Sequence, residues 1–119
     1  MQDFRNLVVW EKAHALTLAI YRHSGEFPRD ELYGLTSQLR RAGASVAANI
    51  AEGCGRNGRA DFARFLQISF GSASELEYHL ILARDLGMLG VKEYDALTKE
   101  AVEVKKMLTA LIQKLKTDN

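Results

Sequence analysis

The stretch from Gln38 to Arg56 limits the possible fold more than any other part of this chain. It reads QLRRAGASVAANIAEGCGR, and its apolar and polar residues recur at helical spacing. The predicted helix carries Ala and Gly where an ordinary core helix would carry Leu or Ile. Small side chains let a neighbouring backbone approach closely, and a regular polar stripe indicates polar neighbours. We therefore expect this helix to be covered on more than one side.

The rest of the chain also favours helices, because it contains a single proline, Pro28, and no strand-like alternation. Four helices are predicted, at about 7–23, from 30 or 31 to 53, 59–86 and 92–116. Asn6 is placed to cap the first helix, and Gly25 is placed to end it. Asn57 or Gly58 is placed to cap the third.

Three of these helices have a clear apolar stripe. The predicted core residues are Leu35, Leu39, Ala42, Val46 and Ile50, then Phe62, Phe65, Leu66, Ser69, Ala73, Leu76 and Leu80, and finally Tyr94, Leu97, Ala101, Val104, Leu108, Leu111 and Leu115. The last set alternates steps of three and four residues, which is a heptad pattern suited to bundle packing. Short connections between long helices favour antiparallel neighbours. We predict one all-α domain over residues 1–119, an antiparallel up-down-up-down four-helix bundle.

Further faces of the second and third predicted helices need partners. The second helix has a polar stripe that consists of Gln38, Arg41, Ser45, Asn49 and Glu52. The third has a second apolar patch, formed by Ile68, Gly71 and Leu82, beside Glu75. Because a bundle covers one side of each helix, we expect a second copy of the chain to cover another. In such a homo-oligomer, the polar stripe and Glu75 are predicted to form an interface or a polar network that sets the register.

Composition and targeting signals narrow the class of protein. Hydrophobic residues make up 47% of the chain and charged residues 26%, as in folded soluble proteins, and the formal net charge is only +1. The first residues contain no apolar signal core, and no run approaches membrane-spanning length. The single cysteine, Cys54, cannot form a disulfide within the chain. We expect a cytoplasmic protein with no membrane partner.

Arginines concentrate around the connection between the second and third predicted helices. Residues 40–64 hold five arginines against two acids, a local charge of +3. The planar guanidinium suits phosphate, and the glycine loop presents backbone N–H groups beside a helix N-terminus. The predicted ligands of RNA or DNA are Arg40, Arg56, Arg59 and Arg64. Such binding is expected to be weak, salt-sensitive and of little sequence specificity.

Simpler roles compete with phosphate binding. For Arg41 we favour an ion pair with Glu52 or Glu75 over contact with a ligand. For Arg56 and Arg59 a phosphate contact and an ordinary surface role both stay open. The four lysines within 105–116 are explained by the dipole of the last helix, although they also add basic surface.

Patterns for catalysis and metal binding are weak. A di-iron site in a bundle needs two Glu-x-x-His motifs, whereas this chain has one, Glu11 to His14. Glu75 and His79 are four residues apart, which is the wrong spacing for that site. For a nuclease, which needs a general acid and a general base, they are the only candidate pair. An ordinary helix-surface pair is the simpler interpretation. No motif ties a histidine to Cys54, as a cysteine nucleophile would require. With all of these patterns weak, we expect no catalytic residue, no metal and no cofactor.

Several short motifs occur in order along the chain. They are Phe4 with 7–13 (LVVWEKA), Phe27-Pro28 with 31–36 (ELYGLT), 38–42 (QLRRA), 49–53 (NIAEG), 61–66 (DFARFL), Gly71-Ser72 and 75–77 (ELE). Together they resemble the four-helix-bundle family encoded in intervening sequences of bacterial 23S rRNA genes, over nearly the whole chain. The chain departs from the family at Cys54, where an aromatic residue is frequent, and at 44–47 (ASVA), where a Val-Ser-Ile-Pro-like run is usual. Without that proline, this helix is expected to be straighter.

The resemblance implies a ring-like homopentamer of four-helix bundles. It also points to a relative, the accessory protein of diversity-generating retroelements, which is a basic pentamer that binds nucleic acid and a reverse transcriptase. No established catalytic activity is implied. The alternative to nucleic-acid binding is therefore a ring-shaped assembly scaffold, or an accessory subunit for a protein partner such as a reverse transcriptase.

Overall fold

The computed structural model describes residues 2–117 and contains four long helices. They are α1 (Val8–Ser24), α2 (Leu35–Cys54), α3 (Arg59–Asp85) and α4 (Val91–Thr117), with 3-10 turns η1 (Phe4–Asn6) and η2 (Arg29–Glu31) before α1 and α2. No strand occurs within this part of the chain. The prediction of an all-α fold is confirmed.

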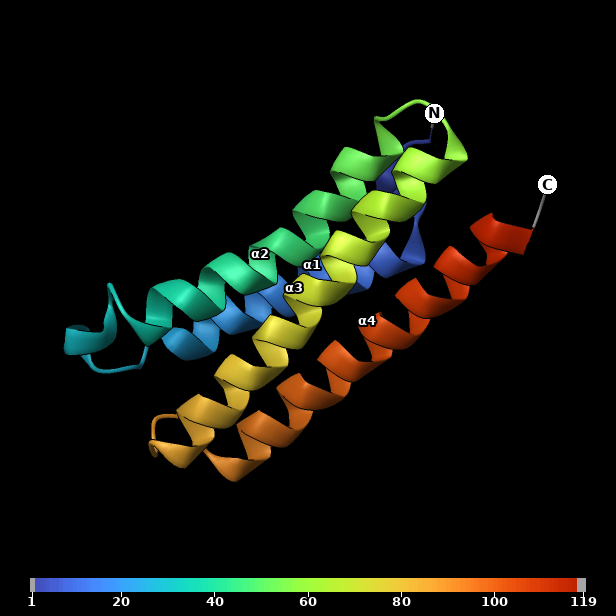
Figure 1. The fold of residues 1–119 in the computed structure, drawn as a ribbon. Helices are drawn as coiled ribbons and strands as arrows, with labels where there is room; N and C mark the ends of the chain where they lie inside the picture. The colour runs from blue at the N-terminus through green and yellow to red at the C-terminus, as the bar shows by residue number, and fades with distance from the viewer. Residues whose placement is uncertain (1, 118–119) are drawn as a thin grey trace.

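Each helix packs against two others. The contacting pairs are α1 with α2, α2 with α3, α3 with α4, and α4 with α1. The chain reverses direction at each connection, so neighbouring helices are antiparallel, and the bundle measures 48 × 22 × 20 Å (Figure 1). The structure is thus a four-helix bundle with up-down-up-down direction. The connection from α2 to α3 and the last turns of α4 lie at the same end.

The core follows the predicted stripes closely. All the core residues predicted on α2 and α3 are buried, and so are Leu97, Ala101, Val104 and Leu108 on α4. Ser69 is fully buried, and its hydroxyl donates to the carbonyl oxygen of Val46 at 2.7 Å. A buried polar group that finds such a partner avoids a desolvation penalty.

One predicted helix start and one predicted cap are wrong. The second helix begins at Leu35 rather than at residue 30 or 31, because Gly34 has φ −111° and ψ −116° and breaks the helical path after η2. The Glu31 carboxylate instead accepts a hydrogen bond from the Leu35 amide at 3.1 Å. Asn6 does not cap the first helix: it belongs to the η1 turn, and Leu7 occupies the N-cap position without a side-chain hydrogen bond.

Other predicted boundaries are confirmed. Gly25 follows α1 as its C-cap, although with right-handed backbone angles, and Gly58 precedes α3. Gly58 and Gly87 have φ of +92° and +76°, values that side chains disfavour, so glycine suits both turns.

The small residues of α2 serve close approach within the chain. A Cβ atom on Gly43 would lie 3.1 Å from Ile20 Cδ1 of α1, and the Thr17 hydroxyl donates to the Gly43 carbonyl oxygen at 3.0 Å. On α3, Phe65 Cβ would lie 2.9 Å from a Cβ on Gly53. The expectation that α2 is covered on more than one side is therefore met by α1 and α3 of the same chain.

Candidate nucleic-acid interface

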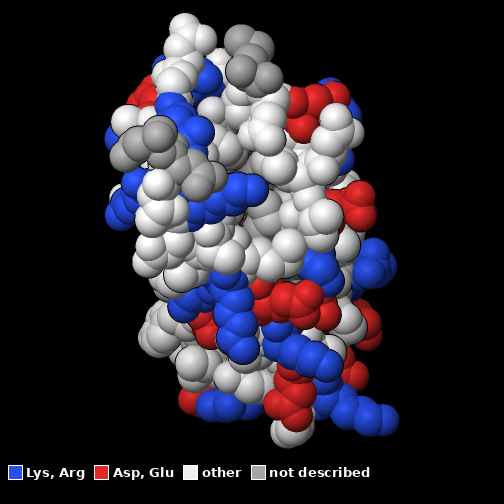
Figure 2. Space-filling model, turned by 90° about the vertical axis from the view of Figure 1, so that its right-hand side faces the viewer, with Lys and Arg blue, Asp and Glu red and all other residues white. Residues whose placement is uncertain are grey.

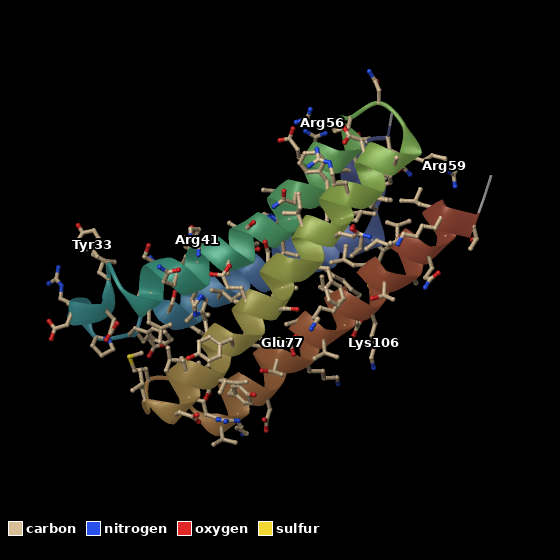
Figure 3. All side chains as sticks on the ribbon, viewed as in Figure 1. Tyr33, Arg41, Arg56, Arg59, Glu77 and Lys106 are labelled. Carbon is tan, nitrogen blue, oxygen red and sulfur yellow. The ribbon has the colours of Figure 1, made fainter. Side chains whose placement is uncertain are left out.

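The loop between α2 and α3 positions two arginines at one end of the bundle. Gly53 packs against α3, and the left-handed Gly58 turns the chain into that helix. Arg56 lies in the loop and Arg59 begins α3, and both are exposed (Figure 3). No side chain caps α3. Its first amides therefore face outward beside these cations, an arrangement that favours anions.

Two arginines near this loop are held in place by neighbours. Arg56 pairs with Glu52 at 3.1 Å, and Arg64 pairs with Asp61 at 3.1 Å. Both guanidinium groups also lie over the Phe65 ring, 4.9 and 4.6 Å from its centre. Roughly half of each arginine side chain stays exposed, 46% for Arg56 and 57% for Arg64. Exposed ion pairs are weak, so both groups remain available to a phosphate.

A pocket of about 430 Å³ lies between this loop and the end of α4. It is lined by Gln2, Gly53, Cys54, Arg56, Gly58, Arg59, Phe62, Leu111, Lys114 and Leu115. Three of these side chains are cationic. Within residues 2–117, neither Arg59 nor Lys114 forms an ion pair. We call Arg56, Arg59, Arg64 and Lys114 the basic end.

Charged side chains are distributed differently at this end and over the rest of the bundle. In Figure 2, basic and acidic side chains alternate across the lower half of the face, whereas in the upper half acidic side chains lie toward the edges and uncharged surface lies between them and the basic side chains. On α3 and α4, Glu77 Oε1 and Lys105 Nζ lie 2.7 Å apart. Of the four cations of the basic end, two are ion-paired and two are not within residues 2–117.

Arg40 does not lie at the basic end. Arg40 lies fourteen positions before Cys54, the last residue of α2, which is roughly 21 Å at 1.5 Å per residue, and Arg56 lies beyond that end. The Arg40 guanidinium donates to the Ser24 hydroxyl at 2.9 Å and to the Tyr21 carbonyl oxygen at 3.3 Å, and lies over the Tyr21 ring. The predicted grouping of all five arginines around the loop is thus wrong for Arg40.

Arg41 is likewise remote from the loop (Figure 3), and its predicted pairing with Glu75 is found. Arg41 Nη2 lies 2.6 Å from Glu75 Oε2 and 2.8 Å from Gln38 Oε1. The same Glu75 oxygen lies 3.0 Å from His79 Nε2. The hydrogen bond with His79 and the charge of Arg41 hold the pKa of Glu75 below its usual value. Glu75 thus bridges α2 and the next turn of α3.

The remaining members of the polar stripe also bond within the chain. The hydroxyl groups of Ser45 and Ser72 lie 2.9 Å apart. The Asn49 amide donates to the carbonyl oxygen and the hydroxyl of Ser45, at 2.8 and 2.9 Å. Glu52 is paired with Arg56. Arg41 and Ser45 find partners on α3, whereas Gln38, Asn49 and Glu52 bond within α2 or with the loop that follows it. The role of the stripe between subunits stays a prediction.

The side chains that were considered for metal binding or catalysis pack against other parts of the chain. Within residues 2–117 no group of three or more His, Cys, Asp and Glu side chains is placed to hold a metal ion. His14 stacks on Trp10, with ring centres 5.0 Å apart. Burial raises the pKa of the Cys54 thiol, which therefore stays protonated near neutral pH and is a poor nucleophile.

Sequence reasoning missed the pocket and the part that α4 plays in it. Leu111 and Leu115 were predicted as core, but they are only partly buried and line the pocket. Lys114 was explained by the helix dipole. The signal was present in the topology, because in an up-down-up-down bundle the ends of the second and fourth helices meet at the same end.

Comparisons with known proteins agree with this fold. Residues 5–110 match the family model described as 23S rRNA-intervening sequence protein. A solved structure from Bacteroides thetaiotaomicron VPI-5482, described as a protein with unknown function from the S23 ribosomal protein family, superposes with a TM-score of 0.83 at 27% identity. That match covers 89% of this chain and 96% of the other.

No curated protein matches the chain. Neither the family nor the matched structure is described by an enzymatic activity. Of the helices in residues 2–117, none is both long and apolar enough to cross a membrane. The family match spans most of the chain and agrees with the motifs and the bundle. The chain therefore belongs to the 23S rRNA-intervening sequence protein family.

Proposed function

We propose that this protein is a non-enzymatic, oligomeric helical bundle that binds RNA or DNA weakly, through phosphate contacts at the basic end. One observation carries the proposal: Arg56, Arg59 and Lys114 line a single pocket beside the uncapped start of α3. Arginine offers two parallel donors to a phosphate, and a helix N-terminus adds backbone donors. Arg40 and Arg41 are not part of this surface.

The net charge of the protein and screening by salt determine how strongly it is expected to bind nucleic acid. The protein carries a net charge of only +1, so attraction comes from the basic end rather than from the whole molecule. Charges separated by more than about 8 Å are largely screened at physiological ionic strength. Contacts with three or four phosphates give a logarithmic salt slope of roughly −3 to −4 on duplex and less on single strands. Repetition of the basic end in an oligomer strengthens binding through multiple attachment.

Charge reversal tests this proposal. The double variant R56E/R59E is compared with R22E/R29E, which makes the same change in net charge on exposed residues near the opposite end. Fluorescence anisotropy with labelled RNA and DNA is measured at low and near-physiological salt. We expect R56E/R59E to lose binding, while R22E/R29E keeps affinity within about threefold. Equal affinities for both variants, with oligomer and helix content intact, would refute the basic end as the binding surface.

The oligomer is supported by exposed apolar residues on α3. Ile68 is 42% exposed and Tyr78 58% exposed, and the exposed Gly71 has open space where a Cβ would stand. Together with the ring implied by the motifs, this stripe of α3 is our proposed subunit contact, with a pentamer as the expected assembly.

A second candidate function is a scaffold for a protein partner, such as a reverse transcriptase. The observation that favours it lies at the other end of the bundle, where Tyr33 is 93% exposed and Leu32 46% exposed. Exposed aromatic residues are typical anchors of protein interfaces. An intact oligomer that binds neither RNA nor DNA at low salt would favour this function over the first.

A further inference from the structure

The pocket at the basic end has two chemically different walls. Arg56 and Arg59 supply positive charge from the loop and the start of α3, and Lys114 supplies it from α4. Phe62, Leu111 and Leu115 supply apolar surface. A site for phosphate alone needs no apolar wall. A ligand that uses both walls would combine an anionic part with a flat or apolar part.

The apolar wall arises because the apolar stripe of α4 continues past the point at which the other helices cover it fully. Leu97, Ala101, Val104 and Leu108 are buried, but the next members of the heptad pattern, Leu111 and Leu115, are only partly covered. In Figure 1 the last turns of α4 stand apart from the loop that joins α2 and α3. Leu111 and Leu115 thus pack against the core on one side and line the pocket on the other.

We propose that this pocket takes an unpaired nucleotide of a single strand, with its base on the apolar wall and its phosphates on the three cations. The inference rests on the proposed function and names its ligand. About 430 Å³ is within the range of roughly 300–1,000 Å³ typical of pockets for small organic ligands. The Gln2 side chain, also in the lining, provides an amide donor and an acceptor for a base edge. A base stacked in a duplex cannot enter the pocket.

This geometry predicts a preference among nucleic acids. Proteins that bind single strands combine a positive groove with side chains that receive unstacked bases. Contact of a base with an aromatic side chain, here Phe62, contributes on the order of tenfold or more in affinity. Removing the bases from a strand while keeping its phosphates should therefore weaken binding by about that factor, whereas a protein that reads only phosphates would not distinguish the two strands.

The experiment is an anisotropy titration of the wild-type protein with three probes of equal length. They are a single strand with normal bases, the same strand built of abasic units, and the duplex. We expect the normal strand to bind on the order of tenfold more tightly than the abasic strand, and also more tightly than the duplex at matched salt. L115Q, which removes apolar wall without changing charge, should abolish this preference. L18Q alters an exposed leucine on α1 and should keep it.

The outcomes separate the two proposals. Equal binding of all three probes, lost in R56E/R59E, would overturn the nucleotide pocket and leave phosphate binding in place. No binding of any probe at low salt would overturn both. If L115Q loses helix content, the comparison of normal and abasic strands on wild-type protein decides the question alone.

Discussion

At the scale of single residues, Gly53 and Gly71 lie in long helices but in opposite surroundings. A Cβ on Gly53 would lie 2.9 Å from Phe65 Cβ and 3.0 Å from Phe62 Cδ1, whereas nothing lies within 4 Å of a Cβ on Gly71. We predict that Gly53→Ala lowers the free energy of unfolding by about 1–3 kcal/mol, since α2 and α3 must move apart. Urea denaturation of the purified protein measures this change.

Gly71→Ala is the matched control. The same added methyl group enters open space in the middle of α3, where alanine favours the helix over glycine. We expect it to raise the free energy of unfolding by roughly 0.5–1 kcal/mol. Similar effects of the two substitutions would contradict the close approach at Gly53.

The bridge between Arg41, Glu75 and His79 predicts a pH dependence. The folded protein lowers the pKa of Glu75 below its usual 4.5, so the stabilisation is present above that value and is lost as the pH falls through the lower folded pKa. Glu75→Gln should reduce the free energy of unfolding at neutral pH by less than about 1 kcal/mol, because the group is partly exposed. The gap from wild type should close in acid, where the carboxyl is itself neutral.

Denaturation at a series of pH values checks this prediction, with Glu26→Gln as control. Glu26 is exposed and forms no ion pair within residues 2–117. A difference between Glu75→Gln and wild type that stays constant from neutral pH into acid would show that the carboxylate charge contributes nothing.

Residue types alone indicated some of these contacts but not others. The i, i+4 spacing of Glu75 and His79 and the charge of Arg41 made their pairing predictable. The contacts of Arg40 were not predictable, because they depend on the groups that the neighbouring helix presents to its guanidinium. Here α1 presents Ser24 and the Tyr21 carbonyl oxygen as acceptors, and they satisfy the guanidinium.

At the scale of elements, periodicity predicted the four helices but not the residue at which α2 begins. The apolar stripes of α2 and α3 match the buried residues, because burial on one side of a helix imposes the helical period directly. The start of α2 depends on one backbone break at Gly34 and one side-chain bond from Glu31, which leave no periodic trace. Local capping is therefore harder to predict than the stripe.

The packing of α1 on α2 gives a prediction at this scale. Ala47 is 8% exposed and part of the core, whereas the adjacent Ala48 is exposed. Ala47→Leu should lower the free energy of unfolding by about 1–3 kcal/mol, because the core cannot receive three more carbons without moving a helix. Ala48→Leu should change it by less than about 0.5 kcal/mol. Thermal melts followed by circular dichroism compare the two, and equal melting temperatures would refute close packing at Ala47.

At the scale of the whole molecule, topology brings together what the chain separates. The basic end joins the loop after α2 to the last turns of α4, which are more than fifty positions apart. Alternating helix direction was predictable from the short connections, so the meeting of Arg59 with Lys114 was in principle predictable too. The pocket itself was not predictable from the sequence. It depends on the residue of α4 beyond which the other helices no longer cover its apolar stripe, and heptad spacing alone does not specify that residue.

The assembly gives the last prediction. Ile68 on α3 and Leu18 on α1 are similarly exposed, at 42% and 46%, so solvent contact alone does not distinguish them. Only Ile68 has an exposed glycine one turn away with open space above it, which would let another subunit's backbone approach. We therefore expect Ile68→Lys to yield smaller species in sedimentation velocity with unchanged helix content, and Leu18→Lys to sediment like wild type. The reverse result would place the subunit contact on α1, and dissociation by neither variant would remove both faces from the contact.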